Sequence, residues 1–118
     1  MQKRTYSILT IGWSVAILFL TLSSSIGEGG FWLLEIPGMD KVAHFGLFFI
    51  LAVMASSFTI KNKTSMVWAI VYVIIIAIIS EYGQSYVESR TSDVLDFLAD
   101  IVGMIAGGFV AKRYLKYM

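Results

Sequence analysis

The sequence predicts an all-α protein that forms a bundle of four transmembrane helices. The chain is 58% hydrophobic, only 14% of its 118 residues are charged, and the apolar residues gather in four long runs. A soluble domain has roughly a quarter of its residues charged, so the deficit indicates that lipid surrounds most of the chain. Because a bilayer core offers no water to backbone groups, spans must be helices or a closed barrel, and these runs lack the alternation of barrel strands.

The four apolar runs lie at residues 6–26, 42–60, 66–86 and 94–111. Each is close to the roughly 20 residues that a helix needs to cross the hydrocarbon core. The first run follows a basic start and is similar to a signal peptide, but it exceeds the roughly 7–15 apolar residues of such a segment, so we interpret it as a retained span. We therefore expect residues 1–118 to form a single integral membrane domain.

The connections divide the charges between the two sides of the membrane. The longest one, residues 27–39, contains Pro37 and an aromatic cluster, and we expect it to lie on the membrane surface. Four antiparallel spans place the N-terminus, the turn around Asn62 and the C-terminus on the opposite side. Seven of the nine basic residues fall on that second side: Lys3, Arg4, Lys61, Lys63, Lys112, Arg113 and Lys116. By the positive-inside rule this side is cytoplasmic, so both termini are predicted to be cytoplasmic.

Composition excludes several kinds of function. The chain has no cysteine, which excludes disulfides, thiolate metal sites and cysteine nucleophiles. It has a single histidine, His44, so a metal site built from several histidines of one chain is excluded as well. The net charge of +1 gives no sign of a nucleic-acid partner.

Ionisable residues lie inside three of the four runs, toward the outer side. At ~1.5 Å per residue, His44 lies about 6 Å below the outer end of the second span, and Glu81 roughly 7 Å below that of the third. Asp96 and Asp100 lie about 5 and 10 Å into the fourth span. Because charged groups inside a membrane are costly and usually functional, we expect these four residues to face one another, and they are the candidate catalytic residues.

The spacing along the fourth span supports a single inward face. Asp93, Asp96, Asp100, Gly103 and Gly107 follow one another at intervals of 3, 4, 3 and 4 residues, which is one stripe of a helix. The two glycines form a small-residue step that lets another helix approach closely. The helices are thus predicted to pack closely in the half of the bundle nearer the cytoplasm and to enclose a polar pocket in the half nearer the outer surface.

Five further polar residues flank this layer and are candidate substrate-binding residues: Asp40, Lys41, Gln84, Arg90 and Asp93. Asp40 and Asp93 begin helices, so each is either an N-cap or part of the site. Lys41 either extends to the surface or, with Arg90, holds a phosphate or carboxylate. Gln84 is either a structural hydrogen-bond partner or a ligand. For the acids inside the spans, the alternative to a functional role is an internal salt bridge that fixes the fold.

The residues of this layer resemble the VanZ-like membrane proteins. Asp40-Lys41-Val42-Ala43-His44-Phe45 is similar to their DKxxHF opening, Glu81-Tyr82-Gly83-Gln84 to their ExxQ segment, and the stretch from Arg90 to Asp96 to their R-T-x-x-x-x-D segment. The ordered set covers positions 40 to 107. One departure is Asp100, at a position where the family commonly has Asn. The resemblance implies a bacterial cytoplasmic membrane protein related to teicoplanin resistance.

Two main functional hypotheses follow. In the first, the outward-facing pocket binds a cell-envelope lipid or a lipid-linked glycan precursor, with or without modifying it, and His44 acts as a general acid or base. In the second, the protein is a non-enzymatic accessory or scaffold whose polar cluster is structural or binds a partner helix, in another membrane protein or in a homo-oligomer. A small transporter is a third hypothesis, although no internal repeat of the transporter type is visible.

The acids of the polar layer outnumber its basic residues, so the sequence does not decide whether a metal ion binds there. Either the acids take up protons and form salt bridges, or a divalent cation such as Mg²⁺, Mn²⁺ or Zn²⁺ supplies the missing charge. The spacing of the acids is not that of a recognised metal motif, so the metal ligands stay unassigned.

Overall fold

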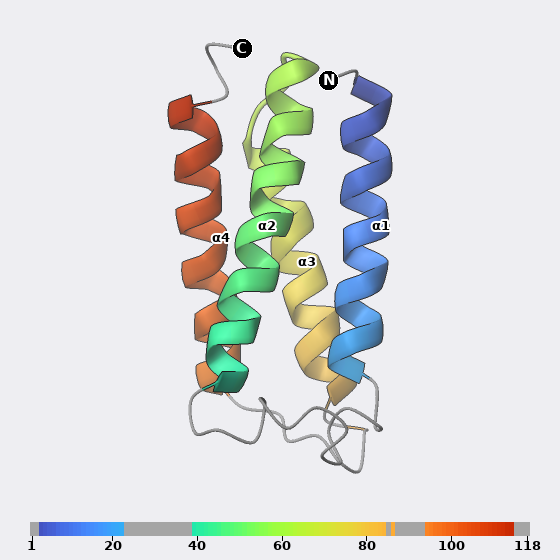
Figure 1. Ribbon diagram of the computed structural model, residues 1–118, viewed down its shortest axis with the longest axis vertical. Helices are drawn as coiled ribbons and strands as arrows, with labels where there is room; N and C mark the ends of the chain where they lie inside the picture. Colours follow the sequence, from blue (N-terminus) through green and yellow to red (C-terminus); the bar gives the residue numbers. More distant parts are fainter. Residues whose placement is uncertain (1–2, 23–38, 85, 87–93, 115–118) are drawn as a thin grey trace.

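The computed structural model describes residues 3–22, 39–84, 86 and 94–114. This part of the chain forms four α-helices and contains no strand: α1 (Lys3–Leu22), α2 (Met39–Lys61), α3 (Val67–Gln84) and α4 (Val94–Tyr114). The helices lie side by side in an up-and-down bundle, with the N-terminus, the α2–α3 turn and the C-terminus at one end (Figure 1). The prediction of an all-α four-helix bundle is therefore confirmed.

The helices differ in how well they match the predicted spans. In the described part of the chain, α1, α2 and α4 are long and apolar enough to cross a membrane, whereas α3 has a shorter apolar segment, Val67–Gly83. At ~1.5 Å per residue this segment is about 25 Å long, slightly less than the ~30 Å hydrocarbon core. Because α3 lies alongside the other helices, it still places its ends near the same two surfaces (Figure 1).

The turn between α2 and α3 has a defined helix cap. The Thr64 amide donates to the Thr59 carbonyl at 3.0 Å and the Lys63 amide to the Ile60 carbonyl at 3.2 Å, the two bonds of a Schellman motif. Lys63 occupies the left-handed position with a φ of 55°, where glycine is more usual. This cap ends α2 sharply and lets α3 return beside it after a few residues.

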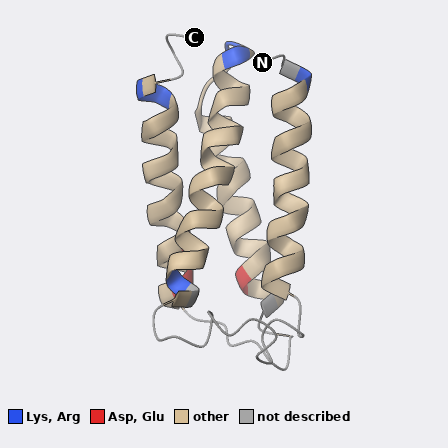
Figure 2. Ribbon diagram, viewed as in Figure 1, with Lys and Arg blue, Asp and Glu red and all other residues tan. Residues whose placement is uncertain are grey.

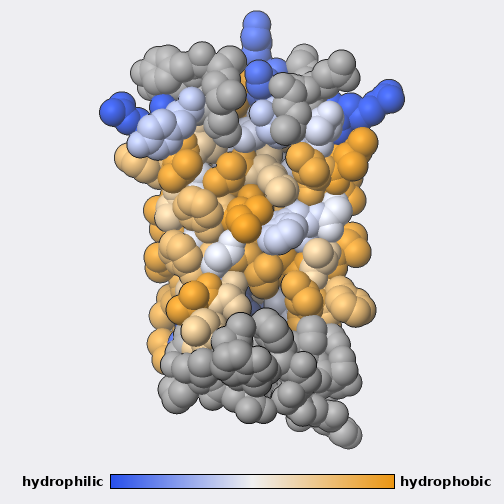
Figure 3. All heavy atoms as spheres, viewed as in Figure 1, coloured by the Kyte–Doolittle hydropathy of each residue, from blue (hydrophilic) through white to orange (hydrophobic). Residues whose placement is uncertain are grey.

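The outer surface of the bundle is apolar between two charged ends. Large side chains such as Phe19, Trp68 and Phe109 are each more than two-thirds exposed, and apolar residues cover most of the middle of the visible face, with a few more polar residues among them (Figure 3). A soluble monomer rarely exposes so large a continuous apolar surface. Most of the described Lys and Arg positions lie at the end that carries the α2–α3 turn, here named the basic end, whereas the described acids, together with Lys41, lie near the other, acidic end (Figure 2).

The interior combines a small apolar core with buried hydroxyl groups. Phe48 and Leu51 of α2 are completely buried against Ile17 of α1 and Val73 of α3. On α1, the buried residues form a stripe at intervals of four, three and four residues: Thr10, Ser14, Ile17 and Thr21. Each hydroxyl of this stripe donates to a carbonyl of its own helix, so the stripe packs without leaving a donor unsatisfied.

Candidate functional site

Two glycines bring α2 and α4 into backbone contact. A Cβ atom on Gly103 would overlap the carbonyl oxygen of Phe45, and one on Gly107 would overlap the carbonyl oxygen of Phe49. Any larger residue would therefore push the helices apart, as expected for a small-residue step. Asp96, Asp100, Gly103 and Gly107 are all buried, so the predicted inward stripe of α4 is confirmed over these four residues.

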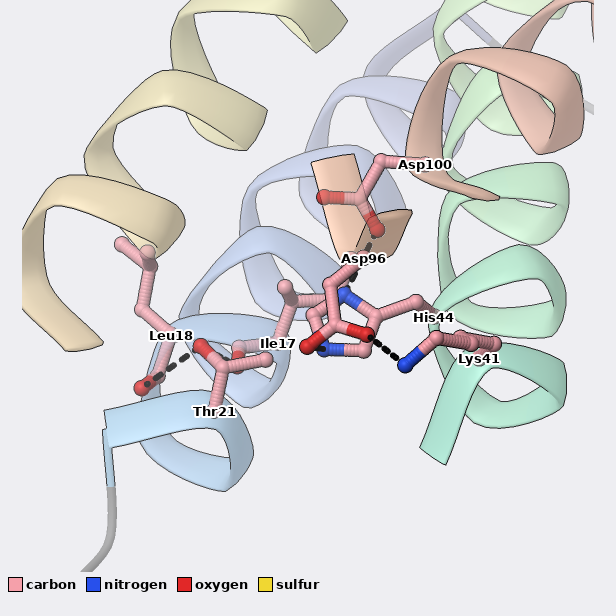
Figure 4. Close-up of polar contacts among 7 residues, drawn as sticks. All are labelled: Ile17, Leu18, Thr21, Lys41, His44, Asp96 and Asp100. Carbon is pink, nitrogen blue, oxygen red and sulfur yellow. Dashed lines mark hydrogen bonds and ion pairs between the residues drawn. The ribbon is translucent and has the colours of Figure 1, made fainter. Parts of the chain in front are cut away.

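The close approach places His44 of α2 against Asp100 of α4. Nδ1 of His44 lies 2.7 Å from Oδ1 of Asp100, within hydrogen-bond distance (Figure 4). Asp100 is completely buried and His44 is only 6% exposed, so water competes little for this bond. With Asp100 as a carboxylate, which can only accept, the imidazole carries its proton on Nδ1, and Nε2 is left to accept or donate elsewhere.

Asp96, one turn from Asp100, lies on the other side of the same imidazole. Its Oδ2 is 3.8 Å from Nε2 of His44, and its Oδ1 accepts a hydrogen bond of 3.1 Å from Nζ of Lys41 (Figure 4). Lys41 is the partly exposed member, with 32% of its side chain accessible, whereas Asp96 is buried. Lys41, His44, Asp96 and Asp100 thus form a chain of contacts that runs from the surface of the acidic end into the bundle; we name it the His44 cluster.

Residues of α3 border the cluster. Glu81 is half-buried and close enough to act electrostatically on both His44 and Asp100. Ser80 is completely buried, and among the described residues neither its Oγ nor Oδ2 of Asp100 has a hydrogen-bond partner. Buried polar atoms without a partner are rare in native proteins.

Two residues of this layer were not predicted from the sequence. Ser80 precedes Glu81 and is hidden in an apolar run, and Thr21 belongs to α1, which carries no charge at this depth. Thr21 is buried and points toward Asp96 and His44, while its Oγ1 donates to the carbonyl oxygen of Ile17 at 2.8 Å (Figure 4). The regular spacing of hydroxyl residues on α1 was the available signal, because a polar residue on an apolar helix usually faces the bundle interior.

The structure brings together four of the predicted site residues and places Glu81 beside them. Asp40 and Gln84 lie within helices α2 and α3, but their side chains are outside the described part of the structure. Arg90 and Asp93 are outside the described residues altogether. Their predicted roles in binding therefore stay predictions.

The described side chains do not form a ready metal site. In residues 3–22, 39–84, 86 and 94–114, no three His, Asp or Glu residues are grouped so that they could hold a metal ion. Lys41 and His44 instead supply the groups that contact the two aspartates. The question of a bound cation therefore stays open.

Comparison with known proteins identifies one family. The model of the VanZ/LLP1 family matches residues 2–115, nearly the whole chain. No curated protein and no solved structure matches the sequence. The match covers the His44 cluster and all four helices.

Proposed function

The chain belongs to the VanZ/LLP1 family and is a multi-pass membrane protein, and we propose that its His44 cluster binds the polar headgroup of a cell-envelope lipid or lipid-linked glycan. The observation that carries this proposal is the buried histidine held between two aspartates of a neighbouring helix, just inside the acidic end. An amphiphilic ligand keeps its tail among the lipids that surround the helices while its head enters this layer. Lipid chemistry therefore fits both the apolar surface and the polar interior.

The geometry of His44 supports acid–base chemistry on the bound headgroup. Asp100, whose Oδ1 lies 2.7 Å from Nδ1 of His44, fixes the orientation of the ring. A carboxylate holds the imidazole in the same way in many catalytic histidine sites. Nε2 then lies on the side of Asp96 and the partly exposed Lys41, where a ligand would enter. Nε2 of His44 is the group that would transfer a proton, and the Lys41 ammonium would hold an anionic oxygen of the ligand.

The polar atoms around the cluster support binding of a hydroxyl-rich or amine-bearing head. Oδ2 of Asp100 is an acceptor without a described partner, and the Ser80 hydroxyl is both a donor and an acceptor. Two aspartates and Glu81 face one lysine and one histidine, so the cluster accepts more hydrogen bonds than it donates. Sugar hydroxyls and ammonium groups are donors that match this excess.

The location of the protein forms part of the proposal. The distribution of basic residues supports a bacterial cytoplasmic membrane protein whose acidic end faces outward, where envelope precursors are displayed. The resemblance to VanZ-like proteins supports a relation to teicoplanin resistance. In this arrangement, binding or modification of an envelope precursor would change the number of targets that the glycopeptide meets.

One observation favours a second candidate function, that of a non-enzymatic accessory or scaffold protein. Both aspartates of the cluster already have cationic or hydrogen-bonding partners within the chain, and His44 and Asp100 are almost fully covered. A structural cluster needs nothing more than these contacts. In that case the biological effect would come from a partner membrane protein or a second copy of the chain.

Substitutions that keep the hydrogen bond but remove the chemistry distinguish the two functions. His44→Asn retains an amide donor near Asp100 and lacks Nε2, and Glu81→Gln removes one negative charge at nearly constant volume. Val42→Ala, at an exposed position of the same helix, is the matched control. Thermal unfolding in detergent and teicoplanin sensitivity of cells expressing each variant are the two measurements.

The headgroup-binding function predicts that His44→Asn and Glu81→Gln both accumulate and unfold near the wild-type temperature, yet lose the effect on teicoplanin sensitivity. Loss of folding together with loss of the effect would favour the accessory function. Full retention of the effect in His44→Asn would exclude a role for Nε2.

A further inference from the structure

A cavity lies at the basic end of the bundle, far from the His44 cluster. It has a volume of about 400 Å³ and lies between α1, α2 and α3. Ser7 and Ile11 line it from α1, Phe58 from α2, Trp68 from α3, and Thr64 from the connecting turn. Its volume falls in the range of ligand pockets, roughly 300–1,000 Å³.

The lining is apolar in effect although it contains several hydroxyl groups. Oγ1 of Thr10 donates to the Tyr6 carbonyl at 2.7 Å, and Oγ1 of Thr59 donates to the Ser56 carbonyl at 2.8 Å. The Tyr72 hydroxyl is bonded to Oγ of Ser14 at 2.6 Å. Because these groups already have partners in the protein, the cavity offers an occupant mainly hydrocarbon contacts.

The cavity is bordered by the exposed apolar surface of the bundle. Ile11 and Trp68 stand at its edges and are 58% and 68% exposed, on a surface that is otherwise apolar. On each helix the lining extends over little more than one turn, or about 6 Å. The first carbons of an acyl chain, next to the glycerol of the lipid, could therefore lie in the cavity. The rest of the chain would continue past Ile11 and Trp68 into the bilayer.

Positive charge flanks the cavity on the side of the basic end. Arg4 precedes Ser7 and Ile11 at intervals of three and four residues, so it lies on the same stripe of α1, one turn nearer the end. Lys61 follows Phe58 by three residues on α2, and Lys63 adjoins Thr64. The charged residues described at this end are all basic, as the blue ribbon segments there show (Figure 2). They are Arg4, Lys61, Lys63, Lys112 and Arg113.

We propose that this cavity binds one acyl chain of an anionic phospholipid, whose phosphate lies between Arg4 and Lys61. The apolar lining and the apolar surface that borders the cavity favour a hydrocarbon chain, and the flanking cations favour an anionic over a zwitterionic headgroup. Trp68 at the edge is suited to the boundary between head and chain. This site is independent of the headgroup-binding function proposed for the His44 cluster.

Native mass spectrometry of the purified full-length chain tests the proposal. The protein is freed of lipid in detergent and titrated with phosphatidylglycerol or with phosphatidylcholine of identical acyl chains. We expect one phosphatidylglycerol per chain to be retained in preference to phosphatidylcholine. Arg4→Gln/Lys61→Gln should lower this preference by about ten-fold, since each cation near a membrane surface contributes measurably to anionic lipid binding.

Two further variants separate the cavity from the general charge of the basic end. Lys112→Gln/Arg113→Gln removes the same charge from α4, which does not line the cavity, and should leave the preference unchanged. Ser7→Phe places a ring in the cavity and should weaken retention of both lipids without unfolding the bundle, because Ser7 is only half-buried.

Three results would overturn the proposal. An equal loss of preference in the two double variants would show attraction by the whole surface rather than by a site. Unchanged retention in Ser7→Phe, with its fold intact by circular dichroism, would show that the lipid binds elsewhere. A lipid-free dimer that Ser7→Phe dissociates would show that a second copy of the chain occupies the cavity.

Discussion

His44 and Asp100 join α2 to α4 through a contact of 2.7 Å in a layer that is almost closed to solvent. The contact lies one turn from Gly103, where α4 touches the backbone of α2 at Phe45. The hydrogen bond therefore depends on the glycine, since a wider helix spacing would move the carboxylate out of reach. The close packing of α4 on α2 at Gly103 and the hydrogen bond between His44 and Asp100 therefore depend on each other.

Replacement of Asp100 tests the value of this bond. Asp100→Asn keeps an acceptor oxygen for Nδ1 of His44, so we expect a free energy of unfolding close to that of the wild type. Asp100→Leu removes the acceptor and leaves Nδ1 buried without a partner, which should cost about 1–2 kcal/mol, near the upper range for hydrogen bonds between membrane helices. Unfolding in mixed micelles, followed by circular dichroism, measures both; equal stability of the two variants would contradict the role of the bond.

Replacement of the glycines tests the close approach of α2 and α4. A Cβ on Gly103 or Gly107 would overlap backbone oxygen atoms, so Gly103→Ala and Gly107→Ala should each destabilise the bundle by about 1–3 kcal/mol, as overpacking does. Gly46→Ala is the matched control, because a Cβ added at Gly46 would meet nothing within 4 Å. This control should be neutral or more stable by up to about 1 kcal/mol, owing to the higher helix propensity of alanine.

A Gly103→Ala variant that is as stable as Gly46→Ala would show that the two helices are not in backbone contact. The same measurement on Gly103→Ala/His44→Asn would show whether the glycine and the histidine are energetically coupled. We expect non-additive effects, since residues that share a contact rarely act independently.

The sequence was sufficient to predict the helices and the face of α4 that is buried. Charge depletion and four long apolar runs decide the fold class because the bilayer limits the possible structures so strongly. The 3–4 spacing of Asp96, Asp100, Gly103 and Gly107 identifies the inward stripe because polar and small residues have no other favourable place. Both features can be predicted from one helix at a time, because they do not depend on which helix is the neighbour.

The pairing within the polar layer could not be predicted in the same way. Depth along a helix places His44, Glu81, Asp96 and Asp100 in one layer, but the choice of partner depends on helix rotation and spacing. In the structure, Asp100 contacts Nδ1 of His44, and Asp96 lies between His44 and Lys41. The bond between Ser14 and Tyr72, which joins α1 to α3, likewise depends on helix rotation and could not be predicted from the sequence.

The orientation of the bundle can be tested by labelling. The native chain has no cysteine, so single cysteines introduced at Asn62 and Arg90 are the only reactive thiols. We expect an impermeant maleimide added to intact cells to label position 90 and to leave position 62 unlabelled, because seven of the nine basic residues lie on the side of Asn62. Labelling after membrane disruption is the control for reactivity; labelling of position 62 in intact cells would reverse the proposed topology.

The pair formed by Lys41 and Asp96 provides the sharpest test of how the His44 cluster balances its charge. Nζ of Lys41 lies 3.1 Å from Oδ1 of Asp96, and the carboxylate is buried while the lysine is one-third accessible. Removal of only the lysine leaves the Asp96 carboxylate buried without this cation, whereas the double replacement removes that carboxylate charge as well. The loss of unfolding free energy is therefore expected to be larger when the lysine alone is removed than when both charges are removed.

We expect Lys41→Met to lower the free energy of unfolding by about 1–2 kcal/mol, a value reduced from that of a fully buried pair because water reaches the lysine. Lys41→Met/Asp96→Asn should recover at least half of this loss, since the neutral amide no longer requires a counter-charge. Lys41→Arg, which keeps the charge, is the control. If the double variant is less stable than Lys41→Met, Asp96 stabilises the bundle mainly through His44 or through residues other than Lys41, and the ion pair is not what balances its charge.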